Sequence, residues 1–273
     1  MPMTGLKRTP TDKFYTITSV ANDCLSIVKE TLDITPTDLC IEPSAGNGAF
    51  ITGIKSIFNH YKFYDLEPMH PDIIKQDYLS YDFQRDNVNK IHIIGNPPFG
   101  RQSTLAIKFI KKSSEFCDSI SFILPKSFKK DSLKKTFPLY FHLITEIDIP
   151  LNSFVVDGNI YNVPCIFQIW VKKDTQRTIP STITPLNYKF VKKNISHDIS
   201  VRRVGVNAGK INKNTANLSI QSHYFIKFDI KLNDDLFNKL SNINYINKEN
   251  TVGPKSISKP ELIREFNDIM ENL

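Results

Sequence analysis

The sequence has few of the features that mark membrane, secreted or metal-binding proteins. No stretch approaches the about 18 consecutive apolar residues of a membrane-spanning helix, and residues 1–10 lack the apolar centre of a signal peptide. The six histidines form no paired-ligand pattern. We therefore expect a soluble, intracellular protein without a membrane partner or a bound metal. The cysteines match no metal or redox spacing and are expected to be reduced; they are Cys24, Cys40, Cys117 and Cys165.

The chain is long enough for one large hydrophobic core and a smaller second unit, with 273 residues of which 40% are hydrophobic and 23% charged. Apolar runs typical of strands alternate with helical patterns over most of its first two thirds. Such alternation predicts an α/β fold with a mostly parallel sheet covered on both faces, here ending in an antiparallel hairpin. The expected strands lie near residues 38–44, 62–66, 73–77, 90–96, 119–125, 143–149 and 164–172.

A segment rich in threonine, serine and proline, 175–185, indicates a linker, and we place a domain boundary between 1–173 and 174–273. The second region holds 15 lysines and arginines against 10 acidic residues, whereas the first holds 20 against 18. This excess suits a surface that meets phosphates, although an AT-rich genome would also enrich a protein in lysine. The elements expected in this small α+β region are strands at 199–211 and 219–229 and helices at 232–240 and 260–270.

The most informative motif is Asn96-Pro97-Pro98-Phe99, which closes the apolar run 91–95. Two prolines cannot continue a strand, so the chain must turn out at the strand's carboxyl end, where open α/β sheets bind ligands. The turn offers mainly acceptors, the Asn96 side-chain oxygen and the Pro97 carbonyl, which suit the two protons of an aromatic amino group. Phe99 adds a flat face on which a base can stack. An ordinary strand-ending turn is the alternative.

A second motif lies upstream, where residues 39–50 run from a short apolar strand through a glycine-containing turn into a helical pattern. Gly46 and Gly48 allow positive φ and close approach of a nucleotide-like ligand. The turn lacks the third glycine of a dinucleotide fingerprint. Glu42 at the strand end would repel a pyrophosphate, but it suits an ammonium or sulfonium group.

Together, these motifs resemble motifs I and IV of the S-adenosylmethionine-dependent amino methyltransferases, specifically the adenine-N6 group. In the same way, 13–16 resembles the family's motif X, 62–65 its motif II and 76–79 its motif III. The resemblance covers about residues 12–172, and its motif order matches the γ arrangement of DNA adenine methyltransferases. It implies a Rossmann-like class I methyltransferase fold, with a seven-stranded sheet whose last strand is antiparallel, and S-adenosyl-L-methionine as cofactor.

The resemblance also implies roles for individual residues. Asp65 is the candidate for the cofactor's ribose hydroxyls, with Glu67 as a rival. The aromatic that faces the target base would be Tyr161, in the loop 156–161. The catalytic turn would be Asn96, Pro97, Pro98 and Phe99, with Phe99 also contacting the substrate. The cofactor-binding residues would be Lys13, Tyr15, Thr16, Glu42, Ser44, Gly46, Asp65, Asp77 and Asn96.

Basic residues supply further substrate-binding candidates. Arg202, Arg203 and Lys210 lie in a stretch typical of a strand and its turn, from which they can reach phosphates or base edges. Lys126 follows the strand 119–125, so it is expected at the same sheet edge as Asn96. An exposed hairpin and a solvated helix start, both without a ligand, are the alternatives for these two stretches.

We interpret the chain as an enzyme that methylates N6 of adenine in nucleic acid, with DNA favoured over RNA. An RNA adenine-N6 methyltransferase, including the kind that acts beside the cap, would use the same site. A glutamine-N5 protein methyltransferase would use a similar turn, usually with tyrosine in place of Phe99. Phe99 and the segment 13–16 both count against this alternative. A catalytically silent nucleic-acid-binding subunit typically loses the cofactor acids or the Asn-Pro-Pro turn, and this chain has both.

Overall fold

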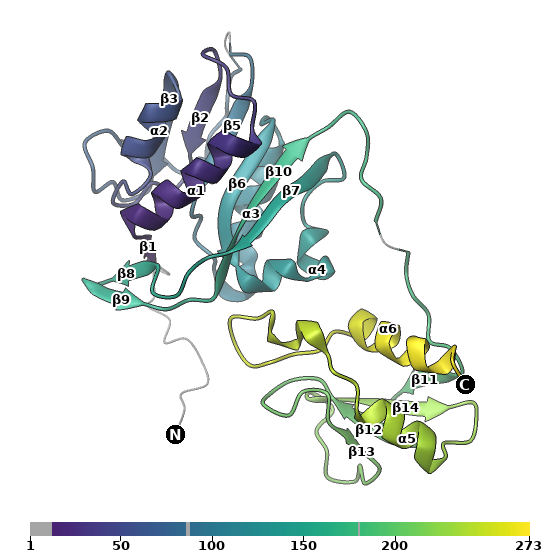
Figure 1. Cartoon of the computed structure of the whole chain (residues 1–273). Helices are drawn as coiled ribbons and strands as arrows, with labels where there is room; N and C mark the ends of the chain where they lie inside the picture. Colours follow the sequence, from purple (N-terminus) through teal and green to yellow (C-terminus); the bar gives the residue numbers. More distant parts are fainter. Residues whose placement is uncertain (1–12, 86–87, 180) are drawn as a thin grey trace. The chain divides into compact units, whose positions relative to one another are not determined.

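In the computed structural model the described residues form two compact units, within 13–179 and 181–273 (Figure 1). The structure describes residues 13–85, 88–179 and 181–273. Within these ranges, every helix is too short or too polar to span a bilayer. The four cysteines are free and buried, as expected for reduced packing residues.

The first unit is built on a seven-stranded sheet with the order β4-β3-β2-β5-β6-β10-β7. The strands from β4 to β6 run parallel, and β10 is antiparallel to both of its neighbours. This order and the reversed strand are those of the Rossmann-like class I methyltransferase fold, which confirms the predicted fold class. The strands are β2 (Leu39–Glu42), β3 (His60–Asp65), β4 (Ile74–Lys75), β5 (Ile91–Gly95), β6 (Ser119–Pro125), β7 (Phe141–Asp148) and β10 (Cys165–Lys172).

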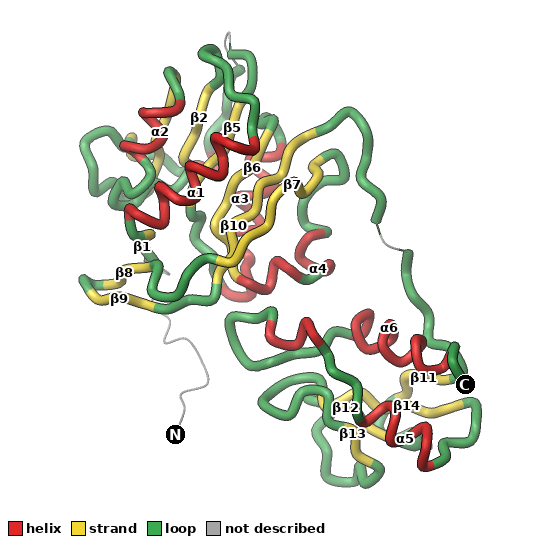
Figure 2. The backbone as a smooth tube through the Cα atoms, viewed as in Figure 1, coloured by secondary structure: helices red, strands yellow, loops and turns green. Residues whose placement is uncertain are grey.

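Helices cover both faces of this sheet, and Figure 2 shows α1 and α3 on opposite faces. In α1, the buried residues Val20, Ala21, Cys24, Leu25 and Val28 recur with the helical period, so one stripe of the helix packs on the sheet. The helices are α1 (Thr18–Thr31), α2 (Ile51–Ile57), α3 (Thr104–Ser114) and α4 (Asp131–Lys134), with 3₁₀ turns η1 (Tyr78–Ser80), η2 (Arg101–Ser103) and η3 (Lys126–Lys129).

A small second sheet joins the N-terminal segment to the connection between β7 and β10. Its order is β1-β8-β9, formed by β1 (Tyr15–Thr16), β8 (Phe154–Val156) and β9 (Asn159–Tyr161). The segment 156–161, predicted as a loop, is therefore the end, turn and return strand of a hairpin. As a consequence, the backbone of Tyr161 is held by pairing with Phe154.

The second unit has a four-stranded antiparallel sheet and two longer helices that share one hydrophobic core. The predicted strand 199–211 is divided, because the connection 203–210 turns the chain back as a hairpin. The strand β11 has no counterpart among the predicted strands. The elements are β11 (Tyr188–Val191), β12 (Ile199–Arg202), β13 (Ile211–Asn212), β14 (His223–Phe228), α5 (Asp234–Ser241), η4 (Ile246–Glu249) and α6 (Lys259–Met270).

A buried polar network ties together the amino ends of β2, β5 and β6. His92 lies with Nδ1 2.8 Å from Ser119 Oγ and Nε2 3.2 Å from Asp38 Oδ2. Asp38 also accepts hydrogen bonds from Thr35 and Asn89. Burial raises the pKa of Asp38, but these hydrogen bonds outweigh burial and lower the pKa to about 2. The ionised carboxylate is thus a structural element of the first unit.

We predict that Asp38→Asn lowers the free energy of unfolding by about 2 kcal/mol at pH 7, the size expected for hydrogen bonds to a charged group. A carboxyl whose folded pKa is depressed contributes stability above its unfolded pKa of about 3.9, and this contribution is lost as pH falls through about 2. The deficit of the variant should therefore shrink between about pH 4 and pH 2. Urea unfolding at several pH values measures it. The exposed Asp33→Asn is the control, and parallel profiles for the wild type and Asp38→Asn would contradict the prediction.

Candidate active site

A cavity of about 320 Å³ lies at the carboxyl ends of β2, β3 and β5. These strands are parallel neighbours, so the residues that follow them meet at one edge of the sheet, as predicted for the two main motifs. The sequence-predicted residues that line the cavity are Lys13, Tyr15, Ser44, Gly46, Asp65, Asp77, Asn96, Pro97, Pro98 and Phe99. The rival acid, Glu67, also lines it.

Asn96 is held in a single orientation by its amide nitrogen. Nδ2 donates to the Phe14 carbonyl at 3.0 Å and to Thr16 Oγ1 at 3.1 Å. The backbone carbonyl of Asn96 accepts from Ser44 Oγ at 3.2 Å, which ties the turn after β5 to the turn after β2. Because Nδ2 can only donate, this anchoring identifies Oδ1 as the remaining acceptor. The buried Oδ1 has no hydrogen-bond partner among the described residues.

The carboxylate of Asp65 organises the turn after β2. Its Oδ2 accepts from the Gly46 backbone N–H at 2.7 Å, and its Oδ1 accepts from the Glu67 backbone N–H at 2.8 Å. Gly46 has φ +52°, and a Cβ there would lie 2.9 Å from the Tyr15 ring. The turn therefore needs glycine both for its conformation and for the approach of Tyr15.

The two other acids that line the cavity, Glu67 and Asp77, are exposed. Glu67 forms an ion pair with Lys13, with Oε2 2.6 Å from Nζ. Asp77 accepts from the Leu79 backbone N–H at 3.0 Å and caps η1. Each carboxylate keeps further acceptor sites, since an ionised carboxylate has about four lone-pair positions.

Glu42, the last residue of β2, is buried and is not among the residues that line the cavity. Its side chain is 2% exposed and packs against Gly95, where a Cβ would lie 3.1 Å from Glu42 Cγ. Gly95 also has φ +151°, so a larger residue would be strained and would displace the acid. Oε2 of Glu42 has no hydrogen-bond partner among the described residues. Burial, and then the charge of Asp65, raise the pKa of Glu42 to about 8.

Aromatic rings form one side of the cavity. Phe14 lies between Phe99 and Tyr161, with ring centroids 6.4 Å and 5.5 Å away. Phe14 and Phe99 line the cavity, whereas Tyr161 contacts Phe14 and is not among the lining residues. Phe14 was not identified from the sequence as a site residue, although Phe14 lies within the segment 13–16 that resembles motif X. The apolar lining residues Leu105 and Phe109 were also missed, because their helical spacing on α3 equals that of core residues.

The remaining predicted residues lie elsewhere. Thr16 supports Asn96 but does not line the cavity. Lys126 follows β6 as expected, but its Nζ lies 3.7 Å from Asp148, so a carboxylate already faces it. The three tail residues Arg202, Arg203 and Lys210 belong to the second unit. Of these, Arg202 is folded back, with Nε donating to the Val204 carbonyl at 3.1 Å.

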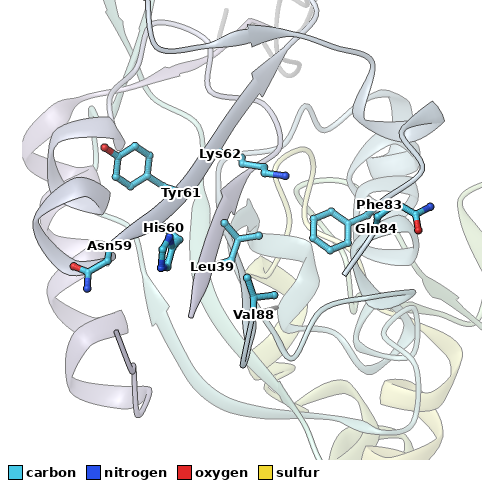
Figure 3. Close-up of a pocket in the computed structure, with 8 residues that line it drawn as sticks. All are labelled: Leu39, Asn59, His60, Tyr61, Lys62, Phe83, Gln84 and Val88. Carbon is cyan, nitrogen blue, oxygen red and sulfur yellow. The ribbon is translucent and has the colours of Figure 1, made fainter. Parts of the chain in front are cut away.

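A second cleft of about 320 Å³ lies at the opposite, amino ends of β2 and β3 (Figure 3). Lys62 extends there toward Phe83, with its Nζ 5.6 Å from the ring centroid, whereas Tyr61 points to the other side of β3. This cleft contains none of the predicted site residues. In the part of the chain that the structure describes, no group of three or more metal-ligating side chains converges.

No protein-family model and no curated protein matches the sequence. Solved structures with similarity include a Pyrococcus horikoshii protein described as a presumed RNA methyltransferase (14% identity, 63% of this chain and 93% of that chain, TM-score 0.46). Another is the 23S rRNA methyltransferase ErmE, with 13% identity over 60% of this chain and 71% of that chain and a TM-score of 0.44. A third is a type I restriction-modification methyltransferase subunit of Streptococcus thermophilus, with 14% identity over 60% of this chain and a TM-score of 0.42. The match spans 47% of that subunit, about half its length. The choice of reaction therefore depends on the cavity itself.

We predict that Glu42→Gln removes a pH-dependent loss of stability. A carboxyl whose folded pKa is raised contributes stability that is fully present below its unfolded pKa of about 4.3 and is lost as pH rises through about 8. Glutamine keeps the shape but does not ionise, so the variant should gain stability relative to the wild type as pH rises from about 4 to about 8, with no further gain above that. Urea unfolding without ligand measures this. The exposed Glu30→Gln should track the wild type, and an identical profile for Glu42→Gln would refute the assignment.

Proposed function

We propose that the protein transfers a methyl group from S-adenosylmethionine to the N6 amine of adenine in nucleic acid, with DNA favoured over RNA. The observation that carries the proposal is the Asn96 side chain, whose nitrogen is anchored and whose buried oxygen has no partner among the described residues. A buried acceptor without a donor costs free energy, and a ligand amine that donates to it removes that cost.

The surroundings of Asn96 support an aromatic amine as that donor. Pro97 follows it in the cavity wall and provides a carbonyl but no N–H. Oδ1 of Asn96 and the Pro97 carbonyl would each accept one proton of the amine. Phe99, 8% exposed and lining the cavity, offers the face on which the adenine ring would stack.

The rest of the cavity fits the cofactor. Asp65 and Asp77 line it with spare acceptor sites, which suit the ribose hydroxyls and the adenine amine respectively. Tyr15, packed over Gly46, and Ser44 provide a close wall for the methionine end. Glu42, whose raised pKa favours the neutral form without ligand, would ionise more easily beside a cationic ligand and would then stabilise it. Lys13 and Thr16 would act by holding Glu67 and Asn96 in place.

When bound, S-adenosylmethionine supplies a methyl group carried on a positively charged sulfur. Asn96 and Pro97 would favour the pyramidal form of the acceptor nitrogen, whose lone pair can then attack. Transfer would form a nitrogen–carbon bond and break the sulfur–carbon bond, which would leave the sulfur neutral. The proton on the alkylated nitrogen becomes acidic, so no strong general base is required. Alignment in a cavity that excludes water would provide most of the acceleration.

In a duplex, the target adenine is stacked and must flip out to reach such a cavity, at a cost of a few kcal/mol. Incubation of the protein with methyl-labelled S-adenosylmethionine and separate pools of duplex DNA, single-stranded DNA, capped RNA and protein identifies the substrate. Nucleoside analysis should find N6-methyladenine, with DNA labelled more than RNA. Label on glutamine, or no label in any pool, would overturn the proposal.

We predict that Asn96→Ala reduces methyl transfer by at least about 100-fold, the size seen when one group that stabilises a transition state is removed. Cofactor affinity, measured by calorimetry, should fall much less than transfer, because the lost oxygen faces the acceptor amine and the lost Nδ2 hydrogen bonds only support the segment 13–16. Thr16→Val removes one of the two anchors of Nδ2 and should have a smaller effect. Asn59→Ala, an exposed asparagine at the amino end of the sheet, is the matched control. Retained transfer in Asn96→Ala would refute the mechanism.

We also predict that Asp65→Ala weakens cofactor binding more than Glu67→Ala. Asp65 holds the backbone of the turn through Gly46 and would contact the ribose, whereas Glu67 is exposed and pairs with Lys13. Calorimetric titration of the two variants compares them directly. Equal affinity for Asp65→Ala and the wild type, with a loss in Glu67→Ala, would move the ribose contact to Glu67.

A further inference from the structure

The second unit contains a cleft of about 450 Å³ at the end of β11, the start of β14 and the first residue of α6. These three labels lie together in the lower part of Figure 1. We name it the aromatic–lysine cleft after five of its lining residues. They are Phe190, Lys192, Lys193, Tyr224 and Lys259.

Two aromatic rings lie side by side in this cleft. Phe190 on the edge strand β11 and Tyr224 on β14 have centroids 5.6 Å apart in an edge-to-face arrangement. Both are partly accessible, unlike the core aromatics Tyr188 and Phe228 of the same strands. The hydroxyl of Tyr224 donates to the Ile257 carbonyl at 3.3 Å, which fixes its ring. The pair is a preformed, accessible surface for a flat apolar ligand.

Cations surround these rings. Lys259 Nζ lies 4.6 Å from the centroid of Phe190, and the Arg203 guanidinium lies 5.4 Å from that of Tyr224. Lys192 and Lys193 line the cleft, and none of the described residues that line it is acidic. Elsewhere in this unit lysines face carboxylates: Lys189, Lys213 and Lys239 pair with Asp229, Asp234 and Asp235 at 2.9–3.1 Å. Among the described residues, Lys192, Lys193 and Lys259 form no ion pair with a carboxylate, and the charge of Glu261 acts on Tyr224 together with that of Arg203.

The combination points to one class of ligand. Flat rings next to cations from three separate segments suit a chain that alternates bases and phosphates, whereas a single nucleotide presents its charge at one end only. Bases inside a duplex have their faces covered by neighbours, so stacking on protein rings requires unpaired bases. We propose that the aromatic–lysine cleft binds single-stranded nucleic acid, with a base on Phe190 or Tyr224 and phosphates on the surrounding lysines and Arg203.

This inference deepens the proposed function. Strand binding at the cleft is argued without that function, but the purpose of the binding, to hold the strand that carries the target adenine, rests on it. The expected recognition surface also moves from the hairpin that carries both arginines to the aromatic–lysine cleft. Of the two adjacent arginines in the hairpin, Arg203 joins the cleft through Tyr224, while Arg202 is engaged with its own turn.

The test is fluorescence anisotropy with the full-length protein and labelled 12-residue probes, a length set roughly by the site sizes of single-strand binders. The probes are single-stranded DNA, RNA of the same sequence, the DNA duplex and an abasic strand with the same phosphates. At least one of Phe190→Leu and Tyr224→Leu should weaken binding of the base-bearing strand roughly 5- to 150-fold, and both should leave binding of the abasic strand unchanged. Tyr224→Phe keeps the ring and should bind like the wild type.

A second set of variants tests the charges. Replacing Lys192, Lys193 and Lys259 by Gln should flatten the salt dependence of single-strand binding, reducing the slope of log K against log salt by up to about 2. The matched control replaces Lys189, Lys213 and Lys239 by Gln, which changes the net charge equally but removes ion-paired lysines. Melting temperatures show whether every variant is folded.

The proposal is overturned if both ring variants bind the base-bearing strand normally, if they weaken the abasic strand equally, or if the control triple variant loses as much as the cleft variant. Duplex bound more tightly than the single strand would also overturn it. The DNA and RNA probes decide which strand the cleft prefers. Strand binding at the cleft without methyl transfer to any pool refutes the proposed function alone, whereas transfer with unaffected cleft variants refutes this inference alone.

Discussion

The two hydrogen bonds donated by the Asn96 amide nitrogen are the interaction on which the candidate site depends. They connect the end of β5 to the Phe14 carbonyl and the Thr16 hydroxyl. Thr16 belongs to β1, which pairs with β8, so the small sheet that carries Tyr161 is attached through the same contact. One side chain thereby sets the direction of its own free oxygen and holds the aromatic wall of the cavity.

The acids of the site have different structural roles because they lie at different depths. Asp65, at the end of β3, accepts two backbone N–H groups and so shapes the turn after β2. Glu42, one strand away, is buried without a hydrogen-bond partner for Oε2 among the described residues, and its pKa is raised. Its position depends on Gly95, since any side chain there would occupy the space of the acid. A cation in the cavity would reduce the cost of ionising Glu42.

The two units divide the chemistry between them. The first has a cavity whose charged lining residues are three acids and one lysine, and the second has accessible cations next to aromatic rings. The basic excess of the tail pointed to this region, but net charge does not distinguish a lysine that faces a carboxylate from one that does not. Lys189 is paired with Asp229, whereas Lys192 and Lys193, a few residues later, line the cleft.

The sequence by itself determined the fold class and the two main motifs, because both depend on local signals. Continuous apolar runs specify buried strands such as β5 and β6, and Pro97 and Pro98 end a strand whatever surrounds them. Only the tertiary structure decided that Phe14 joins the site, that 156–161 is a hairpin, and that Phe190 faces Tyr224 beside Lys259. Asn96 and Phe14 are 82 residues apart, and a contact at that separation leaves no local pattern. Such pairs arise from strand pairing and packing of the whole unit, which the order of residues along the chain does not display.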